Sequence, residues 1–268
     1  MLRTLLKLMV AMVIIAFPLG AAVAADTAVD LELMLAVDVS RSMDNDEQAL
    51  QRDGYVEAFR HKDVTDAIAS GPNGRIAVSY VEWAGPDYQK TLVPWTIIDG
   101  EAAAGAFADR LTAAPITHEH GTSIANGLTF VGASFDGNGI AGERRVIDVS
   151  GDGPNNMGMP VVAARDPLVA KGVTINGLPV MIKRTGDFAS IENLDKYYEN
   201  CVIGGTGAFL VPVTDIQRIA LAIRRKLVLE IAARPAKPGE RSQAVAAGRL
   251  HDRGKAARAV DEGVGDSI

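Results

Sequence analysis

The sequence predicts an α/β fold: a doubly wound, mostly parallel sheet with one antiparallel edge strand and helices on both faces. Of the 268 residues, 48% are hydrophobic and 22% are charged, which is typical of a globular protein. Aromatic residues make up only 5%, whereas there are 27 glycines, a balance that favours an α/β fold with many tight turns over an all-β sandwich. Short apolar runs alternate with amphipathic helical patterns, which indicates parallel strands joined by helical crossovers.

The expected strands are short runs rich in apolar residues. Residues 31–37 form a nearly continuous apolar run, as expected for a strand covered by helices on both faces. Residues 75–83 and 88–98 flank a Gly-Pro-Asp turn and therefore predict an antiparallel hairpin. Pro94 lacks the amide hydrogen that a central strand needs, so we expect the second hairpin strand at the sheet edge. Further strands are expected at 145–149, 173–182 and 208–213.

The expected helices lie between these strands. Asp44 and Glu47 have the spacing of a capping box, and they precede a segment in which Leu50, Val56 and Phe59 recur as an apolar pattern. Further helices are expected at 101–111, at 123–135, at 161–171, and from a Thr214–Gln217 cap to the residues before Arg234 and Pro235.

The charge and cysteine content exclude several classes of function. The formal net charge of −6 and the isoelectric point of about 5.3 disfavour binding to nucleic-acid phosphates. Residues 26–233 carry 18 basic and 28 acidic side chains, and this net charge of −10 attracts cations. Cys201 is the only cysteine, which excludes an internal disulfide and a thiolate zinc site. We expect it to be buried, with intermolecular pairing as the alternative.

The N-terminal segment has the features of a secretory signal peptide. Arg3 and Lys7 precede an apolar run at 8–17, which is followed by Pro18 and a small-residue ending at 22–24. A retained membrane anchor is the alternative, but the run is shorter than the ~20 residues that span a bilayer. We therefore expect cleavage after this ending, a periplasmic or secreted protein, and no membrane span in the mature chain.

The predicted organisation has three parts: a signal peptide at 1–25, one α/β domain at 26–234, and a tail at 235–268. The tail is rich in glycine, alanine and charged residues and has almost no large apolar residue, which predicts disorder. Export would also remove cytosolic ATP and NAD(P)H from the candidate cofactors, and we therefore expect a metal ion.

Three loops between the predicted elements carry oxygen-bearing side chains. The first strand is followed by a D-x-S-x-S array in which Asp38, Ser40 and Ser42 point to one side. Thr122 stands at an expected helix start, and Asp152 lies in a Ser-Gly-Asp-Gly loop after a strand. Ligands of open α/β sheets bind beyond the carboxyl ends of the strands. Two carboxylates, three hydroxyls and water suit Mg²⁺, or Mn²⁺, which keeps some of its own waters.

Each of these residues also has a plainer interpretation. Ser42, Asp44 and Thr122 are all suitable helix N-caps, so no single loop establishes a metal site. The three loops together, in this order and each at a predicted junction, favour the metal. Asn155 and Asn156 follow the third loop and either brace it through side-chain-to-backbone hydrogen bonds or form a simple turn.

Together the three loops resemble the metal-ion-dependent adhesion site of von Willebrand factor type A-like domains, and the resemblance extends from about residue 30 to residue 233. The D-x-S-x-S of that family matches Asp38, Ser40 and Ser42, its threonine matches Thr122, and its later aspartate matches Asp152. The resemblance implies a doubly wound fold in an exported bacterial protein. It also implies that the two serines bind the metal directly, that the other three residues bind it directly or through water, and that a partner carboxylate completes the shell.

The resulting hypothesis is an exported, Mg²⁺- or Mn²⁺-dependent protein-binding module of the adhesion type, whose partner presents an Asp or Glu carboxylate. The alternative is a metal-assisted hydrolase at the same site, in which His118 and His120 recruit Zn²⁺ or act as acid and base. The G-x-S-x-G, H-E-x-x-H and Walker phosphate-loop motifs are missing, which disfavours an enzyme. A small-molecule receptor is a weaker alternative, because a single lobe leaves no interdomain cleft.

Overall fold

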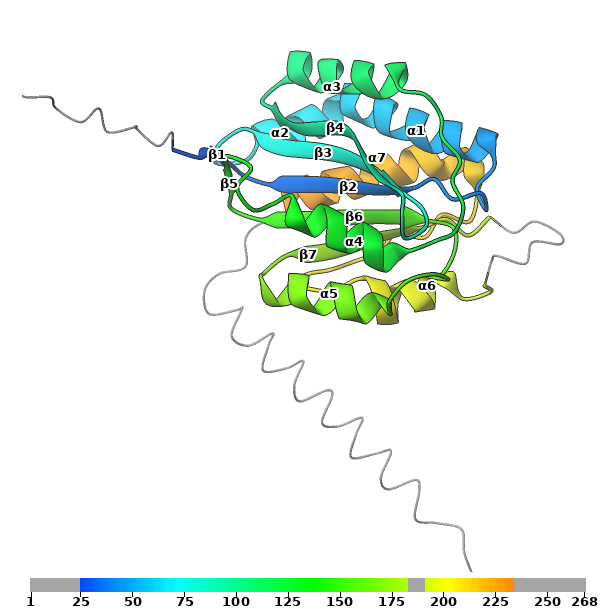
Figure 1. The fold of residues 1–268 in the computed structure, drawn as a ribbon. Coiled ribbons are helices and arrows are strands. Elements are labelled where there is room, and N and C mark those ends of the chain that lie inside the picture. Colours follow the sequence, from blue (N-terminus) through cyan, green and yellow to red (C-terminus); the bar gives the residue numbers. More distant parts are fainter. Residues whose placement is uncertain (1–24, 183–190, 234–268) are drawn as a thin grey trace, which may run out of the picture.

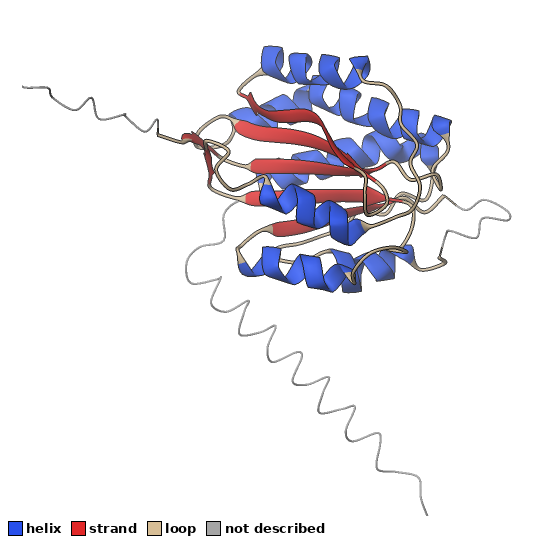
Figure 2. Cartoon of the chain, viewed as in Figure 1, coloured by secondary structure: helices blue, strands red, loops and turns tan. Residues whose placement is uncertain are grey.

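The computed structural model describes residues 25–182 and 191–233, and its centre is a five-stranded sheet with helices on both faces (Figures 1 and 2). The strand order is β4-β3-β2-β6-β7; β4 pairs antiparallel with β3, and the other pairs are parallel. The predicted fold class is therefore confirmed, including β4 at the sheet edge. The strands are β2 (Glu32–Asp38), β3 (Ile76–Trp83), β4 (Gln89–Ile98), β6 (Arg145–Gly151) and β7 (Thr174–Pro179), and a separate parallel pair joins β1 (Thr27–Val29) to β5 (Ile140–Gly142).

Two layers of helices cover the sheet, as Figure 1 shows. Apolar side chains of α1, α2, α3 and α7 form one core with the sheet, and those of α4, α5 and α6 form a second core on the other face. The helices are α1 (Asn45–Arg60), α2 (Lys62–Ala69), α3 (Glu101–Ala113), α4 (Ile124–Ala133), α5 (Val161–Ala170), α6 (Leu194–Tyr197), which continues into a π-helical turn (Tyr198–Val202), and α7 (Ile219–Ala232), which follows a 3₁₀ turn (Ile216–Arg218).

Residues 208–213, expected as a sixth strand, form only isolated bridges. Leu210 bridges to Gly177 of β7 and Val213 bridges to Val180 just after it, so the segment lies beside the sheet edge without a continuous ladder. The amides of Val211 and Val213 donate to the carbonyls of Gly177 and Pro179 (both 2.9 Å), but Pro179 has no amide hydrogen to donate in return, and this interrupts the ladder. The prediction of a strand at these residues was therefore wrong.

The start of α1 follows the prediction, but its buried face does not. The Asp44 carboxylate accepts a hydrogen bond from the amide of Glu47 (2.7 Å), and the Glu47 carboxylate accepts one from the amide of Asp44 (3.0 Å), so the capping box is confirmed. Leu50, expected on the apolar face, is 39% exposed, whereas Gln48 and Gln51 are buried. The reason is that these two glutamines face the loops at the sheet edge, where they form hydrogen bonds.

The cap before α7 also differs from the prediction. Asp215, and not Thr214, accepts the hydrogen bond from the amide of Gln217 (3.0 Å). The residues after this cap form the 3₁₀ turn, and α7 begins at Ile219.

A buried ionic cluster fastens α7 to the sheet. The Lys226 ammonium lies 2.5 Å from a carboxylate oxygen of Asp148 on β6 and also contacts the Glu230 carboxylate. All three side chains are buried, and Asn176 on β7 donates a hydrogen bond to Glu230 (2.9 Å). Burial, and next the charge of Asp148, raise the pKa of Glu230 to about 7. Two carboxylates thus depend on one ammonium in the core.

Some predictions concern residues that the structure does not describe. The signal peptide at 1–25 and the tail at 235–268 fall almost entirely outside the described residues. Within the described ranges, every helix is too short or too polar to cross a membrane. Cys201 is a free thiol that is only partly buried.

Candidate metal centre

The carboxyl ends of β2, β3 and β6 lie side by side at the right-hand edge of the sheet in Figure 1. Asp38, the last residue of β2, pairs with Trp83 of β3, and Val37 pairs with Ser150 of β6. Beyond β2, the chain runs beside the loop between α3 and α4, where the amide of Arg41 donates to the carbonyl of Glu119 (3.0 Å). The three loops singled out in the sequence therefore meet at one edge of the sheet.

A chain of hydrogen bonds joins four of the five predicted ligands. The Asp38 carboxylate accepts a hydrogen bond from the Ser40 amide (2.8 Å), and the hydroxyls of Ser40 and Ser42 lie 2.9 Å apart. The Ser42 hydroxyl donates to the carboxylate of Asp152 (2.7 Å). Asp38 and Ser40 are buried, while the other two are partly exposed, so the chain of oxygens leads from the core to the surface.

Thr122, the fifth predicted ligand, is held at the same edge through its backbone. Its amide donates to the side-chain oxygen of Asn156 (2.9 Å), and its carbonyl accepts from the amide of Asn156 (2.9 Å). The side-chain oxygen of Asn155 accepts from the amide of Ala125 (3.2 Å) at the start of α4. The two asparagines therefore brace the loop after Asp152 against the start of α4, as the first of their two interpretations predicted.

The Asp38 carboxylate lies in an unfavourable electrostatic environment. Asp38 is fully buried, and its Oδ2 atom has no hydrogen-bond partner in the described structure. Burial, and next the charge of Asp152, raise the pKa of Asp38 well above its ordinary value, and the hydrogen bonds with Ser40 oppose this only in part. A buried carboxylate near a second one costs free energy unless it is protonated or a cation lies beside it.

Two supporting residues, Gln51 and Tyr198, were missed in the sequence. Gln51 donates a hydrogen bond to the Ser150 hydroxyl at the end of β6 (2.9 Å). Gly151 lies so close to the site that an added Cβ would stand 2.9 Å from both Asp38 Oδ2 and the hydroxyl of Tyr198. This buried hydroxyl has no hydrogen-bond partner among the described residues either. Gln51 could have been recognised as a polar residue on the buried face of the predicted helix. No sequence pattern identifies Tyr198, which lies in a π-helical turn.

His118 and His120, the residues of the hydrolase alternative, differ in their surroundings. His118 Nδ1 lies 3.3 Å from the side-chain nitrogen of Gln48, and His120 is exposed. The described residues contain no cluster of three or more His, Cys, Asp or Glu side chains that could hold a metal by themselves. Any cation at this edge would therefore depend on serine and threonine hydroxyls as well as on carboxylates.

The residues present fit a hard divalent cation. Carboxylate and hydroxyl oxygens are the ligands that Mg²⁺ and Mn²⁺ prefer in proteins. The partnerless Oδ2 atom of Asp38 has a lone pair to offer, and a cation would offset the repulsion between Asp38 and Asp152. The hydroxyls of Ser40 and Ser42 lie between these two carboxylates in the hydrogen-bond chain.

Comparison with solved structures finds several similar folds. The chain is similar to proximal thread matrix protein 1 (PTMP1) from the mussel byssus with a zinc-occupied MIDAS motif, at 18% identity and a TM-score of 0.57, covering 78% of this chain and 49% of that one. It is similar to the pilus adhesin SpaC from Lactobacillus rhamnosus GG in the open conformation (12% identity, TM-score 0.56, 77% and 31% covered). It is also similar to von Willebrand factor type A from Catenulispora acidiphila (12% identity, TM-score 0.50, 77% and 43% covered).

The chain thus spans half or less of the length of these solved chains. Identities this low bear on the fold alone. A search of curated proteins finds no match. Residues 28–235 match a family that is described as "Protein of unknown function (DUF1194)". The chain therefore belongs to this family, and its fold is that of a von Willebrand factor type A-like domain.

Proposed function

We propose that this protein is a divalent-metal-dependent protein-binding module of the adhesion type. Asp38, Ser40, Ser42, Thr122 and Asp152 would hold the cation, Mg²⁺ or Mn²⁺. The observation that carries the proposal is the buried Asp38 carboxylate, whose Oδ2 atom has no hydrogen-bond partner and whose Ser40 neighbour begins the chain of oxygens to Asp152. When bound, the cation supplies a coordination position for the carboxylate of a partner protein.

The chemistry of the site supports binding of an anionic group. Serine and threonine hydroxyls carry no formal charge, so a cation held largely by them keeps part of its attraction for a further carboxylate. The mussel protein has a zinc-occupied MIDAS motif, and the Lactobacillus protein is a pilus adhesin, which supports a similar role here. The signal-peptide features of residues 1–25 support a periplasmic or secreted location.

Metal binding is tested by urea unfolding in EDTA and then in millimolar Mg²⁺ or Mn²⁺. A cation at a free concentration of about 100 times its Kd adds roughly 2.7 kcal/mol to the free energy of unfolding. The informative variant is Asp38→Asn, which should be more stable than wild type in EDTA, because a buried charge is lost, and should gain less from Mg²⁺. Asp109→Asn is the matched control, since this carboxylate is 73% exposed on α3. An equal gain in Asp38→Asn and wild type, or no gain in wild type, would exclude the metal site.

Partner binding is tested separately. The purified protein is immobilised in Mg²⁺, incubated with a cell-surface extract, and washed with EDTA. A protein that is retained in Mg²⁺, released by EDTA and not retained by Asp152→Ala would support metal-mediated capture of a carboxylate. Retention that survives EDTA, or that is equal in Asp152→Ala, would contradict it.

A further inference from the structure

The outer face of α7 carries an apolar stripe that no element of the described chain covers. The opposite face of the helix is buried, but Leu221, Arg225 and Leu229 recur every four residues on this one. Leu229 is 54% exposed, more than any other large apolar side chain in the described residues. The partly exposed Ala222 and Val228 widen the stripe.

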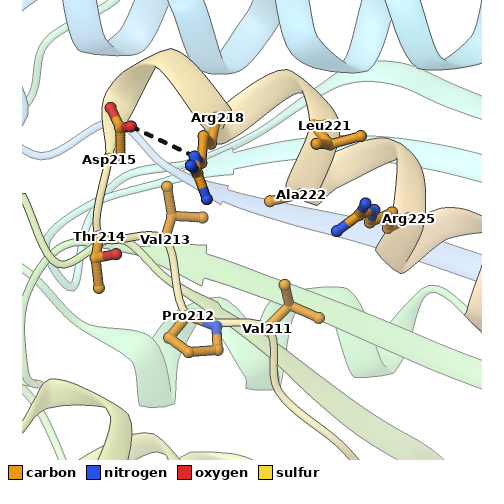
Figure 3. Close-up of a pocket in the computed structure, with 9 residues that line it drawn as sticks. All are labelled: Val211, Pro212, Val213, Thr214, Asp215, Arg218, Leu221, Ala222 and Arg225. Carbon is orange, nitrogen blue, oxygen red and sulfur yellow. Dashed lines mark ion pairs between the residues drawn. The ribbon is translucent and has the colours of Figure 1, made fainter.

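Three neighbouring hollows meet on this stripe, and Leu221 lines all of them. Figure 3 shows the first hollow, which lies between α7 and the extended segment 211–215. The largest hollow has a volume of about 570 Å³, and its lining includes Val228 and Leu229 of α7 and Asp63 of α2. Leu221, Val228 and Leu229 therefore give this hollow an apolar wall against which side chains of a partner can pack.

The arginines around the stripe are not neutralised equally. Arg218 pairs with Asp215 (3.6 Å), as the dashed line in Figure 3 shows, and Arg224 lies 3.9 Å from Asp63. Arg225, midway between the two leucines, is exposed and forms no ion pair with any described residue. Because the body of the protein is acidic, a lone guanidinium between two apolar side chains favours a ligand that supplies its own carboxylate.

We infer that this face of α7 docks an amphipathic helix of a partner protein that carries one carboxylate between two apolar side chains. Leu221 and Leu229 are eight residues apart, which is about 12 Å along an α-helix. A partner helix with two apolar residues seven or eight positions apart, and Asp or Glu midway, has the same spacing. Its apolar side chains then fill the hollows while its carboxylate pairs with Arg225, without any part for the candidate metal centre.

Two other occupants match this face less well. An anionic membrane is flat, whereas the hollows are concave, and Asp63 and Asp215 at their rims repel anionic headgroups. A second copy of this chain related by twofold symmetry would bring its own stripe, so that arginines face arginines at the centre of the interface.

The test selects displayed, helix-forming 20-residue peptides with randomised surface positions on the full-length protein in EDTA. We expect enriched peptides to carry an acidic residue between two apolar residues at the stated spacing. Binding of the synthetic peptide should weaken at least about tenfold in the double variant Arg225→Ser, Leu229→Ser. The matched control is Phe130→Ser, which removes a 41% exposed apolar side chain from α4 on the other face of the sheet and should leave the affinity unchanged.

The inference is overturned if no peptide is enriched, if the enriched peptides lack the acidic residue, or if the double variant binds them as wild type does. It is also overturned if binding requires Mg²⁺, which would place it at the metal centre. Two further measurements exclude the other occupants. Vesicles of phosphatidylglycerol that bind wild type but not the double variant would assign the face to a membrane. A dimer in sedimentation that the double variant dissociates would assign it to a second copy.

Discussion

Replacing Glu230 with glutamine is expected to stabilise the protein at pH 8 and to change little at pH 5. Glu230 and Asp148 share the single ammonium of Lys226 in the core. Glutamine keeps an oxygen that accepts the hydrogen bond from Asn176 but removes one negative charge. Lys226 and Asp148 then remain as a pair of opposite charges. The substitution therefore removes the excess negative charge and leaves no buried ion without a counter-ion.

The size of the effect follows from the pKa of Glu230, which burial and Asp148 raise from 4.5 to about 7. Between these values the folded protein keeps a proton on this carboxyl that the unfolded chain has lost. The contribution to stability is therefore full below pH 4.5 and is lost as the pH rises to about 7. At about 1.4 kcal/mol per pKa unit, the loss is about 3.5 kcal/mol, a large part of the stability of an ordinary domain.

The assay is urea unfolding of wild type and Glu230→Gln from pH 4.5 to pH 8 in EDTA, so that no metal contributes. We expect the two free energies of unfolding to agree near pH 4.5 and to diverge in favour of the variant above it. Glu199→Gln is the control, because Glu199 is exposed and pairs with Lys196 at the surface. If wild type and Glu230→Gln show the same pH dependence, the carboxyl of Glu230 does not hold a proton in the fold, and the reasoning fails.

Three further substitutions test the packing around the site by urea unfolding. Gly151→Ala places a methyl group 2.9 Å from Asp38 Oδ2, and we expect it to cost about 1–3 kcal/mol and to weaken the stabilisation by Mg²⁺; an unchanged response to Mg²⁺ would separate this contact from the metal site. Arg52→Leu leaves the buried Glu82 carboxylate without its counter-ion and should cost about 3–5 kcal/mol at neutral pH. Because burial raises the pKa of Glu82, this loss should shrink in acid, and a loss independent of pH would contradict the ion pair's role. Asp44→Ala removes the cap of α1 and should cost about 1 kcal/mol, so an unchanged stability would show that the cap contributes nothing.

Much of the fold could be predicted because buried strands have a simple signature. The strand β2 is buried at all seven positions, and its apolar run stands out without any periodic pattern. The edge position of β4 followed from Pro94 alone. Residues 208–213 show the limit of this approach, since an apolar run does not guarantee a continuous ladder with the neighbouring strand. The β1 and β5 strands have three residues each, too few for a periodicity to appear.

Part of the candidate site could likewise be predicted from the sequence, and part could not. The sequence predicted that four residues lie close together, because each follows a predicted strand and the ends of parallel strands share one edge: Asp38, Ser40, Ser42 and Asp152. Tyr198 could not, because its hydroxyl reaches the site from a π-helical turn whose position depends on packing across the second core. Local patterns therefore locate residues on strand ends, whereas contacts made across the core require coordinates.

Two buried aspartates on neighbouring strands show why a cation is expected at one of them. Asp148 has the Lys226 ammonium 2.5 Å away, whereas the charged group that acts on the pKa of Asp38 is a second carboxylate. Burial penalises both carboxylates, but the fold supplies a permanent counter-ion only to Asp148. Lys226→Met should therefore destabilise the protein with or without Mg²⁺, whereas Asp38→Asn should stabilise it in EDTA and reduce the gain from Mg²⁺. If Asp38→Asn instead destabilised the protein in EDTA, Asp38 would be a structural residue, and its unpartnered oxygen would give no reason to expect a metal.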